Sequence, residues 1–118
     1  MELNILGQNL NECCLNPLTG YFRDGFCKTN NLDLGTHTVC AIVNQDFLEY
    51  SASMGNDLMT PQPQWKFFGL KPGDKWCLCV LRWLEAEKAG KAPPIVLEAT
   101  HEKTLQFTSL KLLKKYGI

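Results

Sequence analysis

Six cysteines lie in a chain of 118 residues, and no other feature limits its possible folds as strongly. Three uses of these residues are open: small buried hydrophobes, reactive or metal-binding thiols, and disulfides. The N-terminus lacks the basic and apolar segments of a signal peptide, and no apolar run is long enough to span a membrane. We therefore expect a cytoplasmic protein in which most thiols are reduced. The six residues are Cys13, Cys14, Cys27, Cys40, Cys77 and Cys79.

The composition is that of one ordinary globular domain, with 45% hydrophobic and 20% charged residues. Residues 1–118 are therefore expected to form a single domain with a real core. Twelve basic residues balance twelve acidic ones, and the aromatic residues are not interleaved with a basic stripe. We expect neither nucleic acid nor a membrane as a partner, and a monomer or small homo-oligomer.

Hydrophobic patterning predicts short strands at 38–43, 74–81 and 95–99. Helices are predicted at 45–54, with Asn44 as N-cap, at 82–89, and from Ser109 onward, with a short helical turn at 101–105. Turn residues crowd the N-terminal third, and residues 56–73 form a long loop with three prolines. The predicted fold class is α+β: a single two-layer domain with a small mixed sheet, about three helices and a loop-rich N-terminal third.

Two thiols separated by one residue are the first candidate for chemistry. On a strand, the side chains of Cys77 and Cys79 point to the same face, with Cα atoms about 6.6 Å apart. That geometry disfavours a disulfide between them, but it suits a shared metal or soft ligand. The alternative is that both are small apolar residues packed under a helix.

Histidines offer a second set of possibilities. His37 lies three residues before Cys40, and with Cys27, Cys77 and Cys79 these residues make a possible structural zinc set, although the usual CxxC spacing is absent. Either His37 or His101 beside a thiol would make a Cys–His nucleophile pair. The alternative for each histidine is a hydrogen-bonded turn residue.

Polar turns provide further candidates. Arg23-Asp24-Gly25 and Asn56-Asp57 either present polar groups to a ligand or only cap the backbone. The aromatic loop 65–68 suggests an interaction module if its rings are exposed. Motifs for nucleotide binding, serine hydrolysis and calcium binding are absent, so these activities are disfavoured.

Several long motifs resemble one family of small, mostly bacterial proteins with plant relatives, the family known as domain of unknown function 2237. The resemblance covers residues 3–116 and implies a stand-alone cytosolic domain without an assigned activity. This chain departs from the family pattern at Asn16-Pro17, where Asp-Pro is usual, and at Cys13-Cys14, where one cysteine is expected. The motifs that carry it are NPLTGYFRDGFC, HTVCA, FLEYSASMGNDL, GLKPGDKWCLCVLRWLEA and APPIVLEATHEKTL.

We favour a small-ligand or thiol-reactive pocket lined by cysteine and histidine, with a zinc domain or an interaction module as alternatives. The hypothesis requires His37, Cys40, Cys77 and His101 to meet at one place, and it leaves the reaction and any enzyme activity open. The candidate ligand-binding residues are Arg23, Asp24, Cys27, His37, Cys40, Asn56, Asp57, Cys77, Cys79, Arg82 and His101.

Overall fold

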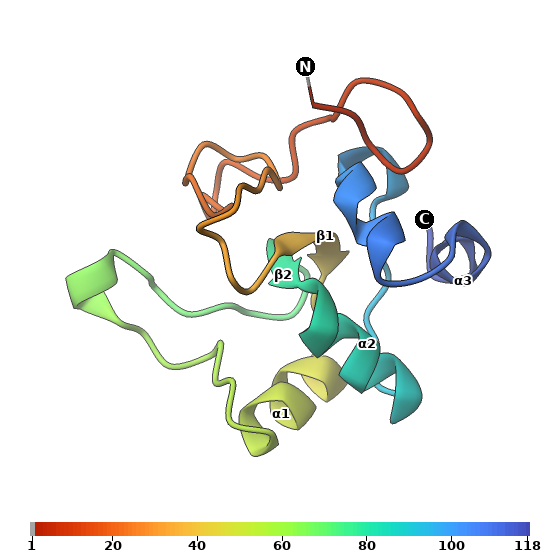
Figure 1. Cartoon of the computed structure of the whole chain (residues 1–118). Helices are drawn as coiled ribbons and strands as arrows, with labels where there is room; N and C mark the ends of the chain where they lie inside the picture. Colours follow the sequence, from red (N-terminus) through yellow and green to blue (C-terminus); the bar gives the residue numbers. More distant parts are fainter. Residues whose placement is uncertain (1) are drawn as a thin grey trace.

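Two antiparallel strands lie at the centre of the protein, whose computed structural model describes residues 2–118 (Figure 1). β1 (His37–Ile42) and β2 (Lys75–Cys79) are the runs of apolar residues that the sequence predicts to be strands. Their register places Cys40 opposite Cys77 and Ala41 opposite Trp76, with an irregularity between His37 and Val39. The register therefore brings two cysteines from distant parts of the sequence side by side.

The helices begin where local capping chemistry predicts. In α1 (Gln45–Ser53), the Asn44 side chain accepts a hydrogen bond from the Phe47 N–H at 2.9 Å. In α3 (Leu110–Lys115), the Ser109 hydroxyl accepts one from the Leu112 N–H at 3.1 Å. α2 (Val80–Lys88) follows β2 directly, so it begins two residues earlier than the sequence pattern suggests and β2 ends at Cys79.

The predicted strand at 95–99 is wrong. Ile95 makes isolated bridges, antiparallel to Ala41 and parallel to Gly117, and the 3₁₀ helix η2 (Leu97–Ala99) follows. The preceding Pro93-Pro94 pair has no N–H groups to extend a ladder, so the pairing stops at a single residue. Two further 3₁₀ helices are η1 (Pro63–Trp65), in the long loop, and η3 (Glu102–Gln106).

The hydrophobic core lies between the sheet and the helices. α1 and α2 pack together on one side of the strands, and η2 and η3 contact β1 (Figure 1). The architecture over the described residues is α+β, as the sequence predicts. None of the helices within 2–118 is long and apolar enough to cross a bilayer. The buried core residues are Ile5, Val39, Ala41, Val43, Phe47, Leu48, Leu70, Trp76, Leu78, Val80, Trp83, Ala86, Ile95 and Leu113.

Two irregular segments flank this core. Residues 12–36, which we call the N-terminal loop segment, contain turns and an isolated bridge in place of helices and longer strands. Residues 54–74 leave the body of the molecule and return to β2 (Figure 1). Residues 2–11 are different, because they are tied by backbone hydrogen bonds to residues 98–102, for example from Ile5 N–H to the Thr100 carbonyl at 3.0 Å.

Candidate functional site

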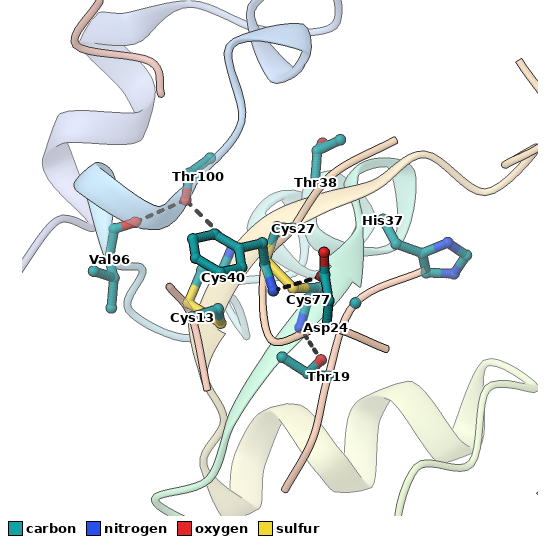
Figure 2. The surroundings of a disulfide bond; sticks show 12 residues. Cys13, Thr19, Asp24, Cys27, His37, Thr38, Cys40, Cys77, Val96 and Thr100 are labelled. Carbon is teal, nitrogen blue, oxygen red and sulfur yellow. Dashed lines mark hydrogen bonds between the residues drawn. A yellow bond between two sulfur atoms is a disulfide. The ribbon is translucent and has the colours of Figure 1, made fainter. Parts of the chain in front are cut away.

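Four of the cysteines form two adjacent disulfides, Cys13–Cys40 and Cys27–Cys77 (Figure 2). The expectation that most thiols are reduced therefore differs from the structure. Cys40 and Cys77 are cross-strand partners in β1 and β2, and Cys13 and Cys27 reach them from the N-terminal loop segment. We call Cys13, Cys27, Cys40 and Cys77 the sulfur cluster. Its residues are 0–5% exposed, which seals the sulfur atoms from solvent.

Backbone hydrogen bonds shape the loop so that its cysteines meet the sheet. The N–H groups of Cys13 and Cys14 both donate to the Gly25 carbonyl, at 2.7 and 3.1 Å. Gly25 adopts φ +90, which glycine tolerates without strain. Thr19 then joins loop and strand, because its hydroxyl accepts a hydrogen bond from the Cys77 N–H at 2.9 Å.

The remaining cysteines, Cys14 and Cys79, are free and partly buried in the described part of the chain. Cys77 bonds to Cys27 and not to Cys79, in agreement with the spacing argument that disfavours a Cys77–Cys79 disulfide. Cys79 lies opposite His37 in the strand register, at the end of β2. β2 thus carries both a buried disulfide sulfur, at Cys77, and a free thiol, at Cys79.

His37 is directed away from the disulfides (Figure 2) and toward Asp33. Its Nδ1 lies 2.6 Å from Asp33 Oδ1, and its backbone N–H donates to Asp33 Oδ2 at 2.9 Å. Thr29 donates a further hydrogen bond to the same carboxylate at 3.0 Å. The Asp33 side chain is 1% exposed and that of His37 is 41% exposed, so the carboxylate is hidden and the ring is accessible.

Hydrogen bonding decides the charge of Asp33. Burial by itself would raise the pKa of this carboxyl, but the hydrogen bonds and charge of His37, together with the Thr29 hydroxyl, hold the pKa below its ordinary value. An ionised carboxylate only accepts, so Nδ1 carries a proton in either charge state of His37, and a neutral imidazole leaves Nε2 without one. Its Nε2 is then an acceptor that no hydrogen bond within the described structure occupies.

Gly35 makes room for this ring. A Cβ atom at Gly35 would lie 2.5 Å from His37 Cε1 and 3.0 Å from Nε2. Any larger residue would therefore displace the imidazole or the loop. Asp33 and Gly35 were not among the residues singled out from the sequence, although an aspartate four residues before a histidine in a glycine-containing turn is a usable signal.

Two adjoining cavities, of about 400 and 230 Å³, open beside His37. They share His37, Leu58, Trp76 and Cys77, and we call them together the His37 cleft. The larger cavity is also lined by Gly20, Tyr21, Arg23, Asp57, Gln62, Trp65 and Phe67, and the smaller by Gly35, Asn56, Leu78, Cys79 and Arg82.

The candidate arginine at the first polar turn faces this cleft. The Arg23 guanidinium lies 5.0 Å from the Trp76 ring centroid and donates to the Gly20 carbonyl at 3.0 Å. Partial burial lowers its pKa, yet an arginine keeps its charge. Asp24 turns away to the Phe26 N–H and to Lys28, so its carboxylate serves the loop.

The other polar candidates are engaged in backbone contacts. Asp57 caps its own loop, where hydrogen bonds from the Thr60 hydroxyl and the Met59 N–H lower the pKa of its carboxyl. The Asn56 carbonyl accepts from the Ser51 hydroxyl at 2.7 Å. Arg82 donates to the Met54 carbonyl at 3.0 Å and joins α2 to the end of α1. Asp57 lines the larger cavity of the cleft, and Asn56 and Arg82 line the smaller one.

His101 lies apart from the His37 cleft, as does Cys40. The His101 Nδ1 caps η3 by accepting from the Lys103 N–H at 3.0 Å. Its Nε2 is buried, without a hydrogen bond, 3.4 Å from a Glu2 carboxylate oxygen. The structure therefore brings His37, Cys77 and Cys79 to one cleft and leaves His101 and Cys40 elsewhere.

The aromatic loop divides into two parts. Trp65 and Phe68 are 72% and 82% exposed, whereas Phe67 packs edge-on against Trp76 at 5.3 Å. Thus Phe67 and Trp76 form an inner wall, and Trp65 stands at the mouth of the larger cavity.

A family model described as an uncharacterized protein conserved in bacteria (DUF2237) matches residues 3–117. The match covers nearly the whole chain, in agreement with the motifs quoted above. No curated protein matches the chain.

Proposed function

Because the chain belongs to the DUF2237 family, whose description assigns no activity, we propose from the geometry that the His37 cleft binds a small organic ligand and that His37 exchanges a proton or hydrogen bond with it. One observation carries this proposal. An imidazole oriented by a buried carboxylate lines a cavity of about 400 Å³, and no hydrogen bond within the described residues occupies its Nε2. A carboxylate that orients a histidine is the arrangement that general bases use.

The walls of the cleft favour a ligand with a flat apolar body. Trp76 and Phe67 provide the inner aromatic face, and Arg23 lies over the Trp76 ring. Within residues 2–118 one side-chain nitrogen of Arg23 is engaged, with Gly20, so further N–H groups are available to a carboxylate or carbonyl. A ligand with a planar body, an acceptor group and a hydroxyl or thiol proton within reach of Nε2 meets these requirements.

Cys79 supports a thiol-reactive form of the same proposal. It is the unpaired cysteine that lines the cleft, and it lies opposite His37 in the strand register. The sealed Cys27–Cys77 disulfide lies two residues away and leaves Cys79 as the accessible sulfur. A ligand seated against His37 would therefore lie beside a nucleophilic side chain.

Ligand-observed NMR with a library of aromatic and heteroaromatic acids tests the binding. Compounds that bind are expected to shift the Trp76 and His37 resonances. His37→Ala is expected to lower their affinity about tenfold, which corresponds to the loss of one good polar contact. Glu49→Ala, on the outer face of α1, is the control. Hits that shift only other residues, or that bind His37→Ala unchanged, would contradict the proposal.

Iodoacetamide labelling tests the thiol form separately. Cys79 is expected to react faster in the native protein than in the unfolded chain, and Cys14 serves as the matched free thiol. If native Cys79 does not react faster than Cys79 of the unfolded chain, the thiol-reactive form is wrong. The labelling result does not bear on ligand binding through His37, which the NMR experiment tests separately.

A further inference from the structure

Three sulfur atoms of the sulfur cluster lie close together in the interior, and the fourth is bonded to one of them. The Sγ atoms of Cys13, Cys27 and Cys77 all lie within 4.8 Å of one another, and the Cys40 Sγ is bonded to that of Cys13. Two of the residues come from the paired strands and two from the N-terminal loop segment (Figure 2). Sulfur atoms of both disulfides therefore lie close enough to contact one common ligand.

We propose that the sulfur cluster, once reduced, is a tetrathiolate site for a soft divalent metal ion, with zinc as the expected occupant. Within the described residues the group holds sulfur ligands without a carboxylate or imidazole, which excludes magnesium and calcium as natural occupants. The zinc set considered from the sequence contained His37 and Cys79 in place of Cys13. The structure directs His37 to Asp33 and places Cys79 in the His37 cleft.

The distances suit zinc after small side-chain movements. Zinc binds thiolates at about 2.3 Å, so the sulfurs of a tetrahedral site lie about 3.8 Å apart. The Sγ atoms of Cys13, Cys27 and Cys77 already lie within 4.8 Å of one another, and Cys40 Sγ, bonded to Cys13, has to move toward them. Each disulfide pair has to open by about 1.7 Å. Hydrogen bonds from the Cys40 and Cys77 N–H groups to Thr100 and Thr19 hold both backbones and do not involve sulfur.

Burial indicates a closed structural site. The four cysteines are 0–5% exposed, so a bound ion would have no open position for water or substrate. Its role would be to hold the N-terminal loop segment on the sheet after the covalent links are broken. The cluster would thus connect the N-terminal loop segment to the sheet through two disulfides when oxidised and through one metal ion when reduced.

The exchange balances with a dithiol as reductant. Each disulfide takes two electrons and two protons from one dithiol, which becomes a disulfide, so two dithiols convert the cluster to four thiols. One Zn²⁺ then displaces four protons and forms a complex with a charge of −2. In the reverse direction, two molecules of hydrogen peroxide and four protons yield two disulfides, free Zn²⁺ and four waters.

Cobalt(II) substitution tests the proposal. Untagged protein is reduced with a water-soluble phosphine, freed of metal and reductant, and titrated with Co²⁺ under anaerobic conditions. We expect one Co²⁺ per chain, with the intense visible bands of a tetrahedral ion and the near-ultraviolet thiolate charge-transfer band. Zn²⁺ should bleach these bands stoichiometrically, and the oxidised protein should show none.

Two double variants locate the ligands. Cys14→Ser/Cys79→Ser removes the two free cysteines and is expected to keep the full spectrum, whereas Cys27→Ser/Cys77→Ser is expected to lose it. Because the second variant could fail to fold, the spectrum of the first is decisive. Loss of the bands in Cys14→Ser/Cys79→Ser, or their absence in reduced wild-type protein, would overturn the proposal.

Discussion

The N-terminal loop segment and residues 37–118 are held by different forces. Residues 37–118, together with Ile5, bury the large apolar side chains of the core cluster, to which the loop segment contributes none of the described members. The loop segment instead buries Cys13 and Cys27 in the sulfur cluster, and Asp33 beneath His37. Apolar burial therefore holds one region, and cross-links with charge-assisted hydrogen bonds hold the other.

This difference explains where the cleft lies. The His37 cleft is bounded by the loop segment at Gly20 and Arg23, and by β2 at Trp76 and Cys77. A loop that packed through large apolar side chains would fill that space. Cross-links fix the loop against the sheet at a few points and leave room between them. The same disulfide that closes one side of the cleft is thus the reason the cleft has a stable shape.

Removal of one cross-link is expected to have the largest effect. Cys27→Ala/Cys77→Ala should lower the free energy of unfolding by about 4 kcal/mol, because the disulfide spans 50 residues of the unfolded chain. Urea unfolding of the variant without reductant measures this. Cys14→Ala/Cys79→Ala removes two free cysteines and should cost less than about 1 kcal/mol. Equal losses in the two variants would mean that the cross-link does not hold the loop.

A core truncation should act on the other region. Leu48→Ala, at a fully buried position of α1, should cost about 3 kcal/mol. Leu81→Ala, at a position 60% exposed on α2, is the control and should cost under about 0.5 kcal/mol. Circular dichroism during urea unfolding reports both. A Leu48→Ala loss as small as the control loss would contradict the assignment of the core.

Asp33→Asn should reduce stability by about 2 kcal/mol at neutral pH, since an amide weakens the charge-assisted hydrogen bonds. The folded pKa of Asp33 is lowered, so its contribution is complete above the unfolded carboxyl pKa of about 3.9 and is lost as the pH falls through the folded value. The difference between wild type and variant should shrink below about pH 4 in urea titrations. A difference that does not vary with pH would exclude an ionised Asp33.

Gly35→Ala should change stability least, by under about 1 kcal/mol, and should still move the His37 ring. The added Cβ meets Cε1 and Nε2, and the ring has an exposed face into which it can turn. A two-dimensional NMR spectrum of the imidazole Cε1–H group measures the displacement. If the resonance and the ligand affinity both stay unchanged, the lack of a side chain at Gly35 does not determine the position of the His37 ring.

Local chemistry made part of this molecule predictable. The side chains of Asn44 and Ser109 cap α1 and α3 as expected because an N-cap depends only on the next three residues. The strand at 38–43 followed from a short β-branched run. The run at 95–99 also begins with two β-branched residues, but it pairs at Ile95 alone because Pro93-Pro94 lack N–H groups and η2 begins at Leu97.

The site depended on contacts that sequence spacing does not encode. Nothing near Cys13 indicates that its partner is Cys40, because the pairing follows from the path of the loop over the sheet. His37 was identified, but its partner Asp33 was not. Arg23, Asn56 and Asp57 border the cleft, where Asp57 caps its own loop and one Arg23 nitrogen donates to the Gly20 carbonyl. That the cleft binds a ligand stays a prediction.

Amide hydrogen exchange tests most directly whether the sulfur cluster holds the N-terminal loop segment. Wild-type protein is compared in its oxidised form and after reduction with a phosphine in EDTA, which withholds metal. We predict that reduction accelerates exchange of the Cys13, Cys14 and Gly25 amides, while the hydrogen-bonded amides of Ile42 in β1 and Leu48 in α1 stay protected. Unchanged exchange in residues 12–36, or equal acceleration in both regions, would contradict the account.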